Sequence, residues 1–82
     1  MKEKRVGTVF SYYSNINVAA IKLEGSLKVG DSIHIKGATT DFVQQVGSIQ
    51  IEHKVVKEAK KGQEIGIKVD DRVRQHDVVY LA

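Results

Sequence analysis

Apolar and polar side chains alternate with a period of two residues along most of this 82-residue chain. The segments 32–36 and 64–70 show the pattern most plainly, because isoleucine or valine takes every second position in each. No segment keeps an apolar period of 3.6 residues over three helical turns. A period of two belongs to a strand with one buried face, so the sequence predicts an all-β protein.

Glycine, asparagine, aspartate and serine interrupt the alternation and predict about six strands. The expected strands are 5–13, 18–24, 32–36, 42–53, 64–70 and 78–81. The inward positions of 42–53 change from even to odd numbers near Gly47-Ser48, which predicts a β-bulge there. A short strand at Val55-Val56 is expected before a polar turn that ends at Gly62. Strands at this spacing are typical of a closed antiparallel barrel or a sandwich, and closure removes exposed sheet edges.

The turns are expected to depend on glycine and short polar side chains, since the chain contains no proline. Val29-Gly30-Asp31-Ser32 places a glycine at a chain reversal and an aspartate that can accept hydrogen bonds from backbone N–H groups. Residues 59–62 are expected to do the same before the next strand. Asn17 suits the turn after the first strand because asparagine tolerates positive φ. These residues are predicted to build the fold.

Composition sets limits on the class of protein. The chain has no cysteine, which excludes disulfides and thiolate metal sites, and its formal net charge is +3. Its longest apolar run, residues 78–82, is far shorter than the roughly 20 residues of a membrane-spanning helix. No signal peptide is visible at the N-terminus. We therefore expect a single cytoplasmic domain over residues 1–82 that has no membrane association.

No catalytic or metal-binding pattern is found. His34, His53 and His76 lack the close spacing of local metal ligands. Asp70 and Asp71 are adjacent, so on a strand end their side chains are expected to point apart. The sequence predicts a protein that is not an enzyme and has no cofactor or metal.

Five segments, in order, carry a family resemblance: Arg5-Val6-Gly7-x-Val9, Leu27-Lys28-Val29-Gly30-Asp31-Ser32-Ile33-x-Ile35, Val46-x-Ser48-Ile49-Gln50, Ala59-x-x-Gly62-x-x-x-Gly66 and Val73-Arg74-x-x-Asp77-Val78-Val79. Together they resemble domain two of translational GTPases such as elongation factor Tu and initiation factor two. The stretch 35–46 also resembles the C-terminal barrel of the collagenase-like peptidase family. Both resemblances imply a six-stranded antiparallel Greek-key closed β-barrel.

The first resemblance implies a stand-alone, non-catalytic binding module that contacts RNA or a ribosome-associated partner. Two basic loops and a pair of tyrosines supply candidate RNA-binding residues, since lysine and arginine bind phosphates and aromatic rings stack on bases. They are Lys54, Lys57, Lys60, Lys61, Arg72, Arg74, Tyr12 and Tyr13. At least one tyrosine is expected to pack in the core with its hydroxyl at the surface.

The second resemblance implies a different function. In this alternative the chain is a protein-interaction or accessory subunit of a separately encoded peptidase-like or RNA-modifying enzyme. The sequence leaves the partner and the oligomeric state open.

Overall fold

The computed structural model describes residues 4–52 and 54–82, and in this part of the chain all regular structure is β. The prediction of an antiparallel all-β protein is confirmed, since every strand pair is antiparallel. The described strands are more numerous than the six expected. They are β1 (Lys4–Tyr13), β2 (Val18–Leu23), β3 (Leu27–Lys28), β4 (Ser32–Lys36), β5 (Asp41–Gln45), β6 (Ile49–Ile51), β7 (Lys54–Val56), β8 (Glu58–Ala59), β9 (Glu64–Lys68) and β10 (Val78–Leu81).

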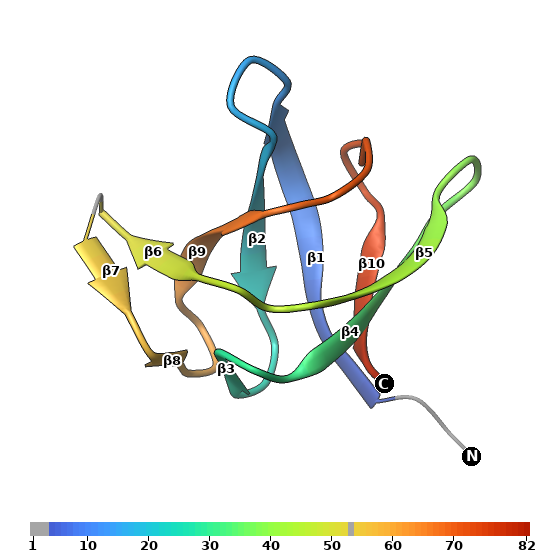
Figure 1. Ribbon diagram of the computed structural model, residues 1–82. Helices are drawn as coiled ribbons and strands as arrows, with labels where there is room; N and C mark the ends of the chain where they lie inside the picture. Colours follow the sequence, from blue (N-terminus) through green and yellow to red (C-terminus); the bar gives the residue numbers. More distant parts are fainter. Residues whose placement is uncertain (1–3, 53) are drawn as a thin grey trace.

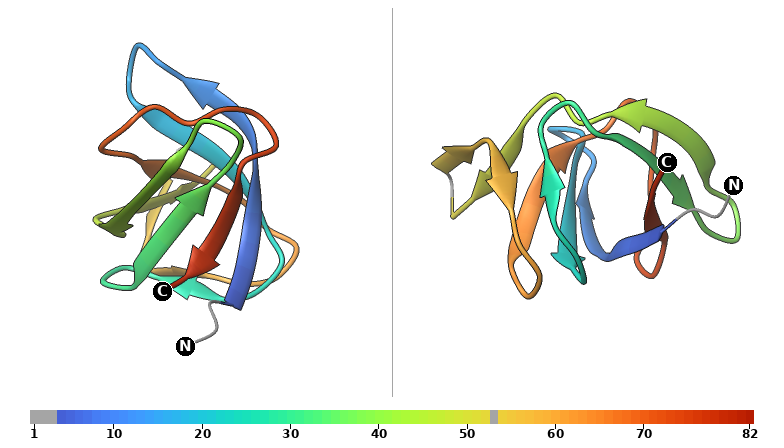
Figure 2. Two further views of the ribbon diagram at one scale, coloured as in Figure 1. Left: turned by 90° about the vertical axis from the view of Figure 1, so that its right-hand side faces the viewer. Right: turned by 90° about the horizontal axis from the view of Figure 1, so that it is seen from below.

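One sheet curls around the interior (Figures 1 and 2). Its order is β5-β4-β10-β1-β2-β9-β6-β7, while β3 and β8 form a separate two-stranded pair. The outermost strands, β5 and β7, are not paired with each other in this order. The predicted six-stranded Greek-key closed barrel is therefore not confirmed in its strand count, closure or connectivity.

The core lies on the inner face of the curled sheet, where the alternation placed it. Each main strand contributes its alternate residues, as shown by the fully buried Ile33 and Ile35 of β4 and Ile67 of β9. Val73 also joins the core, with 1% of its surface exposed, although it lies in a polar segment between β9 and β10. The alternation thus identified the inner face, and the loop contribution of Val73 was missed.

The predicted long strand 42–53 is wrong as one element. The chain forms β5 and β6, which pair with different neighbours, and residues 46–48 lie between them outside any strand. Val46 leaves the sheet because its N–H donates to the Asp31 carbonyl (2.8 Å) and its carbonyl accepts from the Gly30 N–H (2.9 Å). The change of parity near Gly47-Ser48 is real, but it marks a change of partner strand instead of a bulge. His53, the expected end of this strand, lies outside the described residues.

Irregular pairing occurs instead in β1. The register shifts between Arg5 and Gly7 against β10, and between Val9 and Ser11 against β2. Gly7 sits where β1 lies close to β2, since a Cβ atom there would be 2.7 Å from the Ile21 Cγ2 atom. The second irregularity leaves Phe10 without a partner residue in the register and 39% exposed. Bulges redirect side chains in this way.

Candidate functional site

Three turns share one hydrogen-bonded design. They span 28–31, 60–63 and 74–77, and in each the last residue's N–H donates to the first residue's carbonyl. The last residue's side-chain oxygen also accepts the first residue's N–H: Asp31 at 3.0 Å, Gln63 at 2.7 Å and Asp77 at 2.8 Å. The predicted capping role of Asp31 is confirmed, and the same role of Gln63 was not foreseen.

The third position of each turn has a positive φ. Gly30 and Gly62 have φ of 97° and 90°, and His76 has φ of 78°. Glycine adopts this conformation without a steric penalty, and a residue with a Cβ atom does not. Lys60, Lys61 and Arg74 are exposed in these turns, so the turn design positions three of the predicted RNA-binding residues.

The two predicted basic groups lie apart. Lys60 and Lys61 occupy the turn before β9, whereas Arg72 and Arg74 lie in the loop after it, at the other end of that strand (Figure 1). Lys54 and Lys57 are exposed on and beside β7. The two basic loops therefore lie at opposite ends of β9.

The two tyrosines differ in environment. Tyr12 packs against the core, and its hydroxyl lies 3.2 Å from the Asn17 Oδ1 atom, which it contacts as a donor. Tyr13 lies on the outer surface with 49% exposure. The prediction that one tyrosine packs in the core with a surface hydroxyl is confirmed for Tyr12, while base stacking by either ring stays a prediction.

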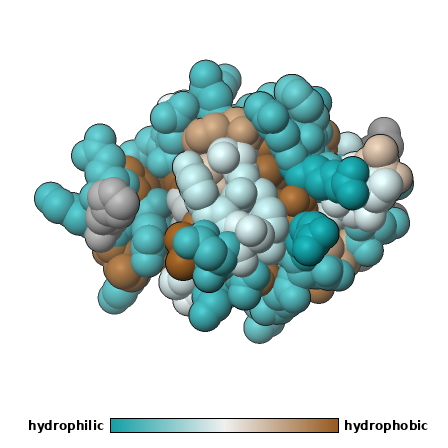
Figure 3. Space-filling view, turned by 90° about the horizontal axis from the view of Figure 1, so that it is seen from above, coloured by the Kyte–Doolittle hydropathy of each residue, from teal (hydrophilic) through white to brown (hydrophobic). Residues whose placement is uncertain are grey.

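Acidic groups accompany the arginine loop. Arg72 and Arg74 line a depression of about 260 Å³ together with Asp71 and Asp41. Asp41 also pairs with His34, and the hydrogen bond from the His34 ring holds the pKa of the Asp41 carboxyl below its usual value. The end of the molecule seen in Figure 3 is mainly hydrophilic, with a pale centre and separate small hydrophobic patches. Charges of both signs therefore share this region.

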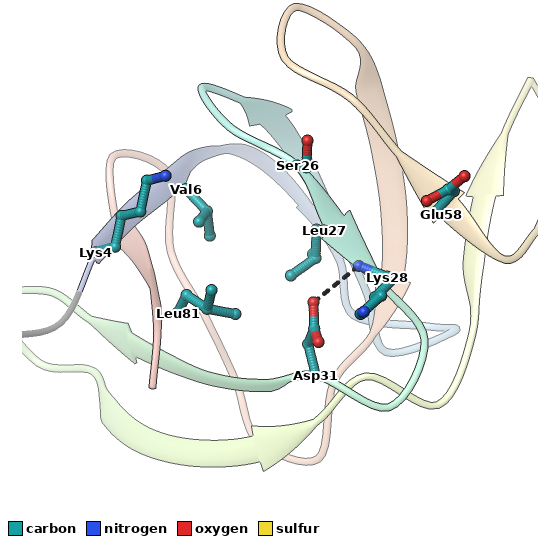
Figure 4. Close-up of a pocket in the computed structure, with 8 residues that line it drawn as sticks. All are labelled: Lys4, Val6, Ser26, Leu27, Lys28, Asp31, Glu58 and Leu81. Atoms are coloured by element: carbon teal, nitrogen blue, oxygen red, sulfur yellow. Dashed lines mark hydrogen bonds between the residues drawn. The ribbon is translucent and has the colours of Figure 1, made fainter.

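A pocket of about 500 Å³ lies at the end of the molecule where β1 begins and β10 ends (Figure 4). Val6, Leu27 and Leu81 form its apolar floor, and their side chains point toward its centre in Figure 4. Lys4 stands on one side and Glu58 on the other. We call this the end pocket; it combines apolar surface with charges of both signs.

The polar side chains that line the end pocket are Lys4, Ser26, Lys28, Asp31 and Glu58. Ser26 is the one hydroxyl in its lining, and no histidine accompanies it among the described lining residues. Asp31 is already bonded to the Lys28 N–H. The described residues also contain no group of three or more His, Asp or Glu side chains placed to hold a metal ion. The sequence pattern did not reveal this pocket, because Lys4, Leu81 and Glu58 lie far apart in the chain and only the tertiary fold brings them together.

Comparison with known proteins shows that the chain is similar to segments of proteins named as proteases and collagenases. It is 47% identical over 77 residues to an uncharacterized protease of Methanocaldococcus jannaschii, covering 93% of this chain and 19% of that protein. It is 42% identical over 77 residues to a collagenase of Porphyromonas gingivalis, covering 92% of this chain and 21% of that protein. The chain thus spans about a fifth of the length of the curated relatives it matches. No protein-family model matches the chain.

Solved structures show the same fold. The C-terminal domain of a presumed U32 peptidase from Geobacillus thermoleovorans matches with a TM-score of 0.91 at 18% identity, covering 96% of this chain and 92% of that one. The selenomethionine form of that domain matches with a TM-score of 0.90 at 19% identity, covering 94% and 98%.

These comparisons correct the functional prediction. The relatives are named protease and collagenase, so they contradict the interpretation of the chain as a translation-factor-like, RNA-binding module. They agree with the second resemblance, to the collagenase-like peptidases. No described helix of this chain is long and apolar enough to span a membrane.

Proposed function

We propose that this chain is a non-catalytic accessory module that binds the catalytic part of a collagenase-like peptidase. The observation that carries the proposal is the alignment with the Methanocaldococcus jannaschii protease, which is close to complete for this chain and covers only 19% of the relative. A segment of that size leaves about four-fifths of the relative to hold a catalytic centre. The fold match to a peptidase's C-terminal domain supports the same division.

The surface chemistry supports binding. The end pocket offers an apolar floor between a lysine and a glutamate, and its lining lacks a nucleophile paired with a base among the described residues. An apolar centre with a polar rim is the usual composition of a protein–protein contact. The end pocket is accordingly the surface that we assign to the catalytic partner.

Residues 1–82 act as one module in this proposal, and its described part consists of the curled main sheet and the separate β3–β8 pair. Backbone hydrogen bonds support treating the curled sheet as a barrel. The Val29 N–H donates to the Lys57 carbonyl at 2.9 Å, and residues 30 and 31 bond to Val46. These bonds link the segments around β3 and β8 to the two ends of the main sheet, so the module is expected to unfold in one step.

A chimera tests the proposal. The matching 77-residue segment of the Porphyromonas gingivalis collagenase is deleted in one variant and replaced by this chain in another. We expect the deletion to lower gelatin cleavage, the chimera to restore it, and this chain alone to cleave nothing. The proposal fails if the isolated chain cleaves gelatin, or if the deletion leaves cleavage and thermal stability unchanged.

A further inference from the structure

The outer face of the sheet carries an apolar groove where an antiparallel sheet usually presents polar side chains to water. Phe10, Tyr13, Val18, Ala20 and Gly66 line it, and its volume is about 220 Å³. We call this the outer groove. It is formed by β1, β2, β6 and β9 and does not share lining residues with the end pocket.

The register explains how the outer groove forms. Ala20 pairs with Gly66, and Gly66 pairs with Gln50, so an alanine of β2 lies beside the glycine of β9. A Cβ atom at position 66 would lie 3.2 Å from the Val18 Cγ1 atom, which shows how closely the groove floor is packed. Tyr13 pairs with Val18 beside this floor, and the irregular pairing of β1 leaves Phe10 on the same face. The result is a shallow floor with an aromatic wall.

The charges at one end of the groove identify its occupant. Glu52 and Glu64 both belong to the lining, and no cationic side chain is among its described residues. Gln50 pairs with Gly66 in the antiparallel pair of β6 and β9. Glu52 and Glu64 therefore both lie toward the same end of the groove. Lys22 faces Glu64 across the β2–β9 pair but lies outside the lining, and no ion pair joins them in the described residues. Two carboxylates that line the same groove favour a positive charge between them.

We propose that the outer groove binds a polypeptide segment in which an apolar side chain lies next to a lysine or arginine. The apolar side chain packs on Ala20 and Gly66 against Phe10, and the basic group lies between Glu52 and Glu64. This proposal stands apart from the accessory role, because a chain that binds no peptidase would still bind such a segment.

A fluorescein-labelled synthetic peptide of alternating phenylalanine and lysine is the direct probe. Fluorescence anisotropy should show saturable binding that weakens as salt rises, because the carboxylate contacts are exposed and screened. Peptides of phenylalanine with glutamate, or of serine with lysine, should bind at least about tenfold more weakly. Equal binding of the three peptides would overturn the proposal.

Matched variants locate the site. Phe10→Ser and the double variant Glu52→Gln/Glu64→Gln should each weaken binding by about tenfold. Val43→Ser and Asp70→Asn remove an exposed valine and an exposed carboxylate elsewhere, and should leave binding unchanged. Amide chemical-shift changes in the unmodified protein provide a measurement that needs no variant. Shifts confined to residues outside β1, β2, β6 and β9 would reject the outer groove.

Discussion

At the scale of single residues, Asp77 is the buried carboxylate that shapes the loop before β10. It is 4% exposed, its Oδ2 atom accepts the Arg74 N–H at 2.8 Å, and it lies against Gly37. Asp77→Ala leaves that N–H unpaired, so we expect a loss of about 1–3 kcal/mol in the free energy of unfolding by urea denaturation. Asp77→Asn keeps an acceptor oxygen and should lose less. The exposed control Asp70→Ala should stay within about 0.5 kcal/mol of the unmodified protein, and an equal loss in the control would contradict the account.

Gly30 and His76 occupy the third position of two equivalent turns, and the turn design predicts opposite effects of substitutions at these two residues. Gly30 has φ of 97° with open space where a Cβ atom would lie, so Gly30→Ala introduces only backbone strain. It should lower the free energy of unfolding by about 1 kcal/mol. His76→Gly removes such strain at φ 78° and should leave stability unchanged or raise it. Thermal melting of both variants distinguishes the two effects, and a stabilising Gly30→Ala would refute the shared turn design.

At the scale of elements, Gln44 joins the edge strand β5 to the last residue of β9 and to the segment that follows it. Its Oε1 atom accepts the Asp70 N–H at 2.8 Å, and its Nε2 atom donates to the Lys68 carbonyl at 3.0 Å. Gln44→Leu removes both bonds and should destabilise the protein by about 2 kcal/mol. The Asp70 amide should also exchange with deuterium faster, whereas Gln45→Leu, an exposed change on the same strand, should leave its exchange rate unaltered.

The pairing of β4 with β5 includes the His34–Asp41 contact and gives a pH dependence. Because the pKa of Asp41 is lowered in the folded state, the unfolded state binds more protons than the folded state at low pH. The stabilisation that the His34–Asp41 contact gives is therefore present at pH values above the ordinary pKa of aspartate. It is lost as the pH falls through the pKa of Asp41 in the folded state. Measured by urea denaturation between pH 2 and pH 5, the free energy of unfolding of Asp41→Asn should depend less steeply on pH than that of the unmodified protein. An unchanged pH profile in that variant would contradict the assignment.

The sequence predicted which face of each strand is buried better than it predicted which segments of the chain lie next to each other. Alternation placed Ile33, Ile35 and Ile67 in the core, because burial of one sheet face depends on local spacing. It did not predict that Val46 would leave β5 to bond residues 30 and 31, because that contact joins distant parts of the chain. The outer groove was missed for the same reason: the proximity of Ala20, Gly66 and Gln50 depends on register across strands.

At the scale of the whole molecule, the chain presents two separate surfaces on one small fold. The end pocket lies where β1 begins and β10 ends, and the outer groove lies across β1, β2, β6 and β9. The hydrogen bonds of the described residues leave no buried side-chain nitrogen or oxygen without a partner. We propose that this fold supports two contacts, one with a catalytic partner at the end pocket and one with a polypeptide segment at the outer groove.

The central claim is that this chain binds a peptidase's catalytic part without performing catalysis itself. The most direct measurement is a calorimetric titration of this chain into the Porphyromonas gingivalis collagenase that lacks its matching segment. We predict saturable one-to-one binding that is weakened by Leu81→Glu in the end pocket and unchanged by Val43→Ser on β5. No heat of binding at micromolar concentrations, with both proteins shown to be folded, would contradict the account.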